Sequence, residues 1–188
     1  LLDIVGTPGN AVADVRSLEN EKILCAPGGS LGGWVAKQLP EKDVVIYDGV
    51  CPTNGVLREA SLDKSRKSHP GAVIIAHPEC REDVLQLADE ICSTAGMFDA
   101  VSRHPEAGTF IVATEWALVY RLRQAYPDKQ FVMADGCFGR RLLCPYMNLI
   151  HLPPITSFPE ESVFPVLLAE AVSGATRRSL PRMLPLPR

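Results

Sequence analysis

Six short apolar segments constrain the fold of this chain more than any other feature of its sequence. They are KILCAP at 22–27, DVVIYD at 43–48, AVIIAH at 72–77, TFIVAT at 109–114, QFVMAD at 130–135 and NLIHL at 148–152. Most carry consecutive apolar residues, many of them β-branched, instead of alternating apolar and polar residues. Continuous apolar strands of this kind are typical of parallel sheets that helices cover on both faces.

Helical patterns lie between these segments. Apolar residues recur every three or four positions at 31, 35 and 39, at 84, 87, 88 and 91, and at 118, 122 and 125. Strands that alternate with helices predict an α/β fold, with three-layer sandwich domains on short parallel sheets. We expect the Pro-rich tail from Leu180 to Arg188 on the surface.

Charge and hydropathy exclude several classes of function. The 188-residue chain has a formal net charge of −3, which gives no field to attract a nucleic acid backbone or an acidic membrane. No apolar run approaches the roughly 20 residues of a membrane helix, and the N-terminal stretch LLDIVGTPGN lacks the order of a signal peptide. We therefore expect a cytoplasmic protein with small-molecule or protein partners and with its six cysteines reduced.

Three of the segments continue from an apolar strand through a polar turn to a cysteine. They are DVVIYDGVC, AVIIAHPEC and QFVMADGC, which end at Cys51, Cys80 and Cys137. A pseudo-symmetric repeat leaves such a trace, but three short matches also arise by chance, and both interpretations stay open.

His77 and Glu79 follow the strand expected at 72–77 and flank Pro78. Two positions apart in extended backbone, they point the same way, and the proline stiffens the bend. A histidine beside a carboxylate serves as acid, base or anion ligand, and ligands of open α/β sheets gather at the carboxyl ends of strands. The alternative is that the pair only caps the next helix.

Two further polar pairs lie at expected helix ends. Ser93 and Thr94, within CSTAG, are candidate donors to a phosphate or carboxylate, or simply end a helix. Thr114 and Glu115 precede the helical pattern at 118–125, where a carboxylate near the positive end of the helix dipole is typical of capping.

Two cysteines precede proline, Cys51 in DGVCPTN and Cys144 in LLCPYMN. Such pairs are common around iron–sulfur ligands held in loops, whereas free cysteines are also among the most buried residue types. The sequence contains no CxxC or HxxxH pair, so it indicates a structural zinc site only weakly.

Taken in order along the chain, these stretches resemble the quinolinate synthase family, the iron–sulfur enzymes of NAD biosynthesis. AHPEC matches the family intact. The other matches are TPGNAV for TSxNA, ILCAPGGSLGGWVA for P-D-x-x-L-G-x-x-V-A, DGVCPTN for G-x-C-x-V-H, ADEICST for A-D-x-x-G-S-T, FIVATEWALVYRL for F-I-x-x-T-E-x-G and CPYMN for C-x-x-M-K.

The resemblance implies three pseudo-symmetric α/β domains around a [4Fe-4S] cluster, which is held by one cysteine from each domain. It places the family's second domain at about 1–80, the third at about 81–160, and a C-terminal helix with the Pro-rich tail at 161–188. The first domain, with its cluster cysteine, has no counterpart in the sequence. The implied reaction condenses iminoaspartate with dihydroxyacetone phosphate to quinolinate, with an aspartate-oxidising enzyme as a partner that supplies iminoaspartate.

The resemblance also implies roles for individual residues. Cys51 and Cys144 match cluster ligands, and His77 and Glu79 match the catalytic pair that contacts substrate. The implied substrate-binding residues are Thr7, Asn10, His77, Glu79, Ser93 and Thr94.

The sequence departs from the family pattern in six of these stretches. Gly28 replaces an aspartate, Cys92 and Ala117 each replace a glycine, and Asn148 replaces a lysine. Pro8 stands where the family has serine, which leaves Thr7 and Asn10 as the remnants of that turn. Thr53-Asn54 replaces the valine and histidine that follow the ligand cysteine.

Three hypotheses stay open at this point. The chain is part of a quinolinate synthase, or a diverged relative that acts as a binding or interaction module. The third is a metal site of another kind, with zinc on Cys51, Cys80, Cys144 and His77.

Overall fold

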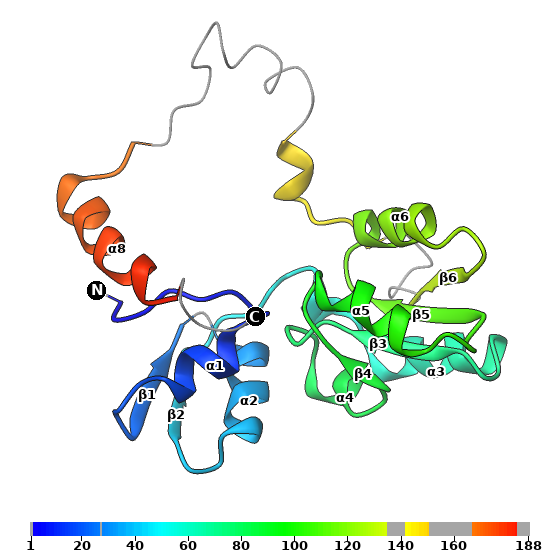
Figure 1. Ribbon diagram of the computed structural model, residues 1–188, viewed down its shortest axis with the longest axis horizontal. Helices are drawn as coiled ribbons and strands as arrows, with labels where there is room; N and C mark the ends of the chain where they lie inside the picture. Colours follow the sequence, from blue (N-terminus) through cyan, green and yellow to red (C-terminus); the bar gives the residue numbers. More distant parts are fainter. Residues whose placement is uncertain (1, 27, 135–141, 151–166, 184–188) are drawn as a thin grey trace, which may run out of the picture.

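The computed structural model describes residues 2–26, 28–134, 142–150 and 167–183. Its elements form two groups, one with β1 and β2 and one with β3 to β6 (Figure 1). The α-helices are α1 Ala11–Arg16, α2 Gly29–Gln38, α3 Glu59–Ser68, α4 Glu82–Leu85, α5 Gly96–Arg103, α6 Trp116–Ala125 and α8 Glu170–Met183. The strands are β1 Lys22–Cys25, β2 Asp43–Ile46, β3 Val73–Ala76, β4 Glu90–Ile91, β5 Thr109–Ala113 and β6 Gln130–Met133. Short 3-10 helices form at η1 Asn54–Val56 and η2 Met147–Leu149.

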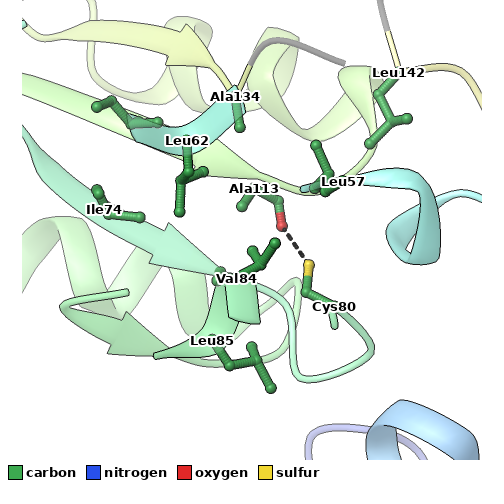
Figure 2. Close-up of a cluster of buried hydrophobic side chains, with 11 residues drawn as sticks. Leu57, Leu62, Ile74, Cys80, Val84, Leu85, Ala113, Ala134 and Leu142 are labelled. Carbon is green, nitrogen blue, oxygen red and sulfur yellow. Dashed lines mark hydrogen bonds between the residues drawn. The ribbon is translucent and has the colours of Figure 1, made fainter. Parts of the chain in front are cut away.

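The larger group is built on a parallel sheet of four strands in the order β4-β3-β5-β6. On one face, Ile74 packs with Leu62 of α3 and Val84 of α4 (Figure 2). On the other face, Phe110 packs with α5 and α6. Helices therefore cover both faces, which explains why the strands are continuously apolar. The expected α/β fold with short parallel sheets is confirmed, and this unit is a three-layer sandwich.

The smaller group has a parallel sheet of two strands, in which Lys22 lies opposite Asp43. Helices α1 and α2 cover one face of it, where Val15, Ile23 and Val35 are buried. Leu24 is 68% exposed. Because neighbouring side chains of a strand point to opposite faces, Leu24 lies on the face that α1 and α2 do not cover.

The two sheets repeat one layout at a constant spacing along the chain. Thr109 lies 87 residues after Lys22, and its partner Gln130 lies 87 residues after Asp43. Helix α6 also begins and ends 87 residues after α2. The pseudo-symmetric repeat is thus present, and it relates DVVIYDG to QFVMADG. The third matching stretch, AVIIAHPEC, forms β3, which has no counterpart strand among the described residues of the smaller group.

Five of the six expected strands form, whereas the one expected at 148–152 does not. Residues 147–149 form η2, which belongs to neither sheet, and Ile150 is exposed. Residues 151 and 152 lie outside the described residues. The prediction was wrong for 148–150 because an apolar run becomes a strand only where a neighbouring strand pairs with it.

The helix expected over 84–91 is also shorter than predicted. Helix α4 ends at Leu85, and the chain returns to the sheet as β4. Asp89 causes the return, because its backbone N–H donates to the Ile74 carbonyl at 2.9 Å and its carboxylate accepts from the Ile74 N–H at 2.7 Å. Both bonds tie the segment to β3.

The chain passes from the smaller sheet to the larger one between Ile46 and Val73, upstream of the domain boundary expected near residue 80. Helix α8 lies within the range in which a C-terminal helix was expected, and it contains Pro181. Ser179 donates to the Leu2 carbonyl, which brings α8 beside the N-terminal segment. In the part of the chain that the structure describes, no helix has the length and apolar character needed to cross a membrane.

Ile111 and Leu24 occupy equivalent positions in the repeat, but Ile111 is 0% exposed and Leu24 is 68% exposed. We predict that Ile111→Ala lowers the free energy of unfolding by about 2–5 kcal/mol, because it leaves a cavity in a packed layer. Leu24→Ala, the matched control, should change it by less than about 0.5 kcal/mol. Urea unfolding followed by circular dichroism measures both variants, and equal losses would contradict the open face at Leu24.

Candidate functional site

The polar residues singled out in the sequence lie at one edge of the larger sheet. His77 follows β3, Ser93 follows β4 and Thr114 follows β5. These three strands are parallel neighbours, so their carboxyl ends meet at the same edge. Clefts at that edge are where ligands of open α/β sheets bind.

Four side chains from three segments form a hydrogen-bonded cluster at this edge. The Asn54 carboxamide donates from Nδ2 to His77 Nδ1 at 3.3 Å and to Glu79 Oε2 at 3.2 Å. Its Oδ1 accepts from the Thr114 hydroxyl at 3.2 Å. His77, Asn54 and Thr114 are buried, whereas Glu79 is partly exposed. Asn54 therefore joins the end of β3 to the end of β5 and holds the histidine and carboxylate together, with His77 Nδ1 3.6 Å from Glu79 Oε2.

The surroundings of His77 assign its tautomer. Nδ1 accepts from the Glu79 backbone N–H at 3.3 Å as well as from Asn54, so the ring proton belongs on Nε2. Burial lowers the pKa of His77 below its ordinary value, and the nearby Glu79 carboxylate opposes that shift more weakly. The imidazole is therefore neutral at pH 7, with Nε2–H available as a proton donor.

Cys51 and Cys144 are both linked to the short loop that contains Thr53 and Asn54. The Asn54 backbone N–H points at Cys51 Sγ, 3.5 Å away. The backbone N–H of Met147 lowers the pKa of the Cys144 thiol, and Thr53 adds to this effect. The Thr53 hydroxyl is buried and acts on that sulfur without the geometry of a full hydrogen bond. The donors around Cys144 favour its thiolate, the form in which cysteine binds a metal.

Cys80 has the opposite surroundings. It is fully buried in an apolar cluster with Leu57 and Val84, and its thiol donates to the Ala113 carbonyl at 3.3 Å (Figure 2). Burial raises its pKa to about 12. A thiol that donates a hydrogen bond and resists ionisation is a poor ligand, which argues against zinc on Cys51, Cys80, Cys144 and His77.

The two predicted cluster ligands fit an iron–sulfur group only in part. Their loop positions and hydrogen-bond donors are those of thiolate ligands. Within the described residues, however, no group of three His, Cys, Asp or Glu side chains is placed to hold a metal. Among the described residues, the predicted cluster ligands are therefore only the two thiols of Cys51 and Cys144.

The predicted substrate residues Thr7 and Asn10 form a second cluster at the start of α1. Asn10 Oδ1 accepts from both the backbone N–H and the hydroxyl of Thr7, each at 2.7 Å. Asn10 Nδ2 donates to Asp14 Oδ1 at 3.2 Å. Asp14 is only 3% exposed, and its Oδ2 has no hydrogen-bond partner among the described residues. Burial raises the pKa of Asp14 to about 6.

The second cluster also reaches the larger sheet. A Cβ at Gly9 would lie 3.1 Å from Ser93 Oγ, so the Thr7–Asn10 turn contacts the end of β4. Thr94, predicted to act with Ser93, is instead exposed, and Ser93 accepts from the Gly96 N–H at 3.3 Å. The structure thus brings Thr7, Asn10 and Ser93 together in one cluster and His77 with Glu79 in another.

Sequence reasoning missed Asn54 and Asp14 as parts of these clusters. Asn54 stood out only as a departure from the histidine of the family pattern. Asn54 lies three residues after Cys51, in a polar turn that follows an apolar strand, and this position could have indicated that it belongs to the site. Thr114 was noted as part of a helix start, whereas its hydroxyl bonds Asn54 and the capping bond comes from Glu115, which accepts from the Ala117 N–H at 2.6 Å.

An α/β sandwich with acid–base and thiol side chains at the carboxyl ends of its strands is typical of enzymes that act on small molecules. Comparison with known proteins narrows this class. A family model described as quinolinate synthetase A protein matches residues 1–185. The chain belongs to this family.

Several curated relatives are named quinolinate synthase. The one from Geotalea uraniireducens is 37% identical over 186 residues, which cover 99% of this chain and 59% of the relative. The one from Thermodesulfovibrio yellowstonii is 33% identical, over 96% of this chain and 58% of the relative. A relative from Methanosarcina acetivorans, named quinolinate synthase 1, is 34% identical over 95% of this chain and 57% of its own length. The chain therefore spans a little under three fifths of the relatives it matches.

We predict that His77 titrates below 6.5, and that Asn54→Ala raises this pKa, because the substitution removes a donor to Nδ1 and admits water. Since the folded-state pKa lies below the unfolded one, the stability that neutral His77 contributes is lost as pH falls below about 6.5. A pH titration of the histidine Cε1 protons by NMR measures both chains. Asn20→Ala, at an exposed loop position, is the control and should leave the curve unchanged. An unshifted titration in Asn54→Ala would contradict the tautomer assigned above.

We predict an opposite dependence for Asp14. Its pKa rises from 3.8 to about 6 on folding, so the folded state binds the extra proton between these values. Stability from this group is present below pH 4 and is lost as pH rises to about 6. Asp14→Asn cannot ionise, so the difference in melting temperature between this variant and the parent chain should grow in favour of the variant between pH 4 and about pH 6. Above about pH 6 the difference should stay constant. Asp99→Asn, an exposed acid on α5, is the matched control. A difference in melting temperature that does not change with pH would contradict the raised pKa of Asp14.

Proposed function

We propose that this chain carries substrate-binding and cluster-binding parts of a quinolinate synthase. The proposed reaction condenses iminoaspartate with dihydroxyacetone phosphate, releases phosphate and water, and closes the pyridine ring of quinolinate. The observation that carries the proposal is the convergence of two cysteines distant in sequence on the Thr53 loop. Asn54 in the same loop bonds His77 and Glu79. The name shared by the relatives supports the same reaction.

In this proposal, His77 and Glu79 move protons on bound substrate. Neutral His77 has its proton on Nε2 and is suited to give it to a developing alkoxide or leaving hydroxyl. The Glu79 carboxylate, partly exposed, is suited to take a proton from carbon or nitrogen. The Asn54 carboxamide keeps the two groups in fixed orientation, so that acid and base act on one substrate molecule.

Thr7, Asn10, Ser93 and Thr94 bind the anionic ends of the substrates in this proposal. Hydroxyl and amide donors suit carboxylate and phosphate groups. Thr7, Asn10 and Ser93 belong to one contacting cluster, which supports a shared role. Thr94 is exposed beside them and free to turn toward a ligand.

Cys51 and Cys144 are proposed as two ligands of a [4Fe-4S] cluster. When bound, such a cluster supplies a Lewis acid that polarises a carbonyl or hydroxyl of the substrate. The third ligand lies outside the described set, and it comes from the part of the relatives that this chain does not span. The proposed partner is an enzyme that oxidises aspartate to iminoaspartate, since the imine hydrolyses unless it is used where it is made.

The test is anaerobic reconstitution with iron and sulfide, followed by measurement of bound iron, acid-labile sulfide and quinolinate. We predict that Cys51→Ser and Cys144→Ser each lower bound iron at least several-fold and make the cluster absorption bleach faster in air. Cys25→Ser is the matched control, because Cys25 is a half-buried thiol of β1 outside the site.

The outcomes separate the proposal from its rivals. Equal iron in all three variants would remove Cys51 and Cys144 as ligands. Bound zinc without iron would favour another metal site. A chain that binds no metal, and forms no quinolinate even with the remaining part of a relative added, would be a diverged binding module.

A further inference from the structure

The hydrogen bonds of the Thr7–Asn10 turn run in one direction, toward the buried carboxylate of Asp14. Asp14 is 3% exposed, and its Oδ1 accepts from Asn10 Nδ2 at 3.2 Å. Its other oxygen, Oδ2, has no partner within the described residues. Burial raises the pKa of Asp14 to about 6, so at about pH 7.5 the carboxylate is ionised and can only accept. Asp14 therefore holds the N–H side of the Asn10 carboxamide.

Thr7 fixes the opposite side of the same carboxamide. Asn10 Oδ1 accepts from the Thr7 backbone N–H and from the Thr7 hydroxyl, each at 2.7 Å. A backbone N–H cannot accept and a carboxylate cannot donate, so neither neighbour allows the Asn10 amide to turn over. The Thr7 hydroxyl then has to give its own proton to Asn10. Thr7 is exposed, and its Oγ1 presents only acceptor lone pairs to a ligand.

Ser93 has the opposite polarity. Its Oγ accepts from the Gly96 N–H at 3.3 Å, which leaves the hydroxyl proton of Ser93 for another acceptor. Both hydroxyls border the space beside Gly9, where a Cβ would lie 3.1 Å from Ser93 Oγ and 3.8 Å from Thr7 Oγ1. Gly9 does not have a positive φ, so its backbone does not require glycine, but a side chain there would enter this space. An acceptor and a donor from distant parts of the chain thus face one space.

We propose that Thr7 and Ser93 together recognise an anionic oxygen that lies beside a hydroxyl or N–H group, and that Asp14 is the positioning residue that makes Thr7 an acceptor through Asn10. Ser93 donates to the anionic oxygen, and Thr7 accepts from the neighbouring donor. The substrate class is a carboxylate or phosphate ester that also carries a hydroxyl or an imine N–H. This inference rests on the proposed function, which assigns these residues to substrate binding, and it defines the part of the substrate that each hydroxyl meets.

The test measures the binding of matched probes to the full chain at about pH 7.5 by NMR, from the shift of the Gly9 amide. L-malate and succinate are dicarboxylates that differ by one hydroxyl, and glycerol 3-phosphate and propyl phosphate differ only in hydroxyls. We expect the hydroxyl-bearing member of one pair to bind at least about three-fold more tightly, because one further hydrogen bond forms. The pair that shows the preference identifies the anionic group as a carboxylate or a phosphate.

Variants separate recognition from packing. Thr7→Val removes the acceptor and should bring the ratio of the two affinities close to one, whereas Thr7→Ser should retain the preference. Asp14→Ala should also bring the ratio close to one, because Asn10 loses its acceptor and the Thr7 hydroxyl is free to turn. Asp14→Asn should retain the preference, since its carboxamide oxygen still accepts from Asn10. Thr109→Val, at the amino end of β5, is the matched control and should leave both affinities unchanged.

Four results would overturn the inference. They are equal affinities within both pairs, no binding of any probe, a preference that survives Thr7→Val, and a preference that survives Asp14→Ala. Circular dichroism checks the fold of Asp14→Ala, and the variants of exposed Thr7 test the inference even if that chain unfolds. Probes that bind without preference, and more weakly to Ser93→Ala, would leave the proposed binding of anionic groups in place and remove only the polarity assigned to Thr7. No iron or sulfide is added, so the test of the reaction stays independent.

Discussion

The pairing of β3 with both β4 and β5 is the constraint on which the larger unit depends. Through β3, Asp89 is bonded back to the sheet, and His77 N–H donates to the Ala113 carbonyl at 3.2 Å. The Cys80 thiol donates to the same carbonyl, so the bend after β3 is fixed against the end of β5. Where this central strand is present, both faces are buried. In the smaller unit, whose described residues include no such strand, one face of the sheet stays exposed.

The Asn54 carboxamide links the segments of the site, as β3 links the strands of the larger sheet. Its two N–H groups and one carbonyl reach three other side chains, so one residue sets the orientation of both His77 and Glu79. Two effects compete at His77, since burial disfavours its charged form and Glu79 favours it. Burial is the larger of the two effects, so the ring is neutral while Asn54 donates to both His77 Nδ1 and Glu79 Oε2. A histidine at position 54 would add a second titratable ring to the cluster. With asparagine there, the residue that bridges His77 and Glu79 stays uncharged at every pH.

The sequence predicted those parts of the fold that depend on local pattern. Apolar runs such as VIIA and TFIVA are buried on both faces, and such runs are visible without tertiary context. Helix α3 was not predicted, because its sequence EASLDKSRKS is mostly polar and only Leu62 and Ser65 are buried. Strand β4 has two residues, which is too short for any periodicity, and it exists through its bonds to β3.

The sequence predicted individual residues of the candidate site, but not the contacts between segments that are distant in the chain. His77 and Glu79 are neighbours in sequence, so their proximity followed from two-residue spacing at a strand end. The Asn54–Thr114 bond joins residues 60 positions apart, and nothing local to either residue indicates it. A contact of that kind follows from strand order, which depends on pairing across the whole sheet.

The cysteines show how local environment divides one residue type into different chemical roles. Cys80 follows directly after the AHPE bend, yet apolar packing and a carbonyl acceptor keep it a thiol. Burial also raises the pKa of Cys92, to about 11. Cys144 lies instead in a loop where backbone N–H groups face the sulfur, which stabilises negative charge. Because a following proline has no N–H, the donors to these loop sulfurs come from residues farther along the loop, Asn54 for Cys51 and Met147 for Cys144. The proline thus helps to shape a loop whose later amides point back at the sulfur, which gives a physical reason for cysteine before proline at both positions.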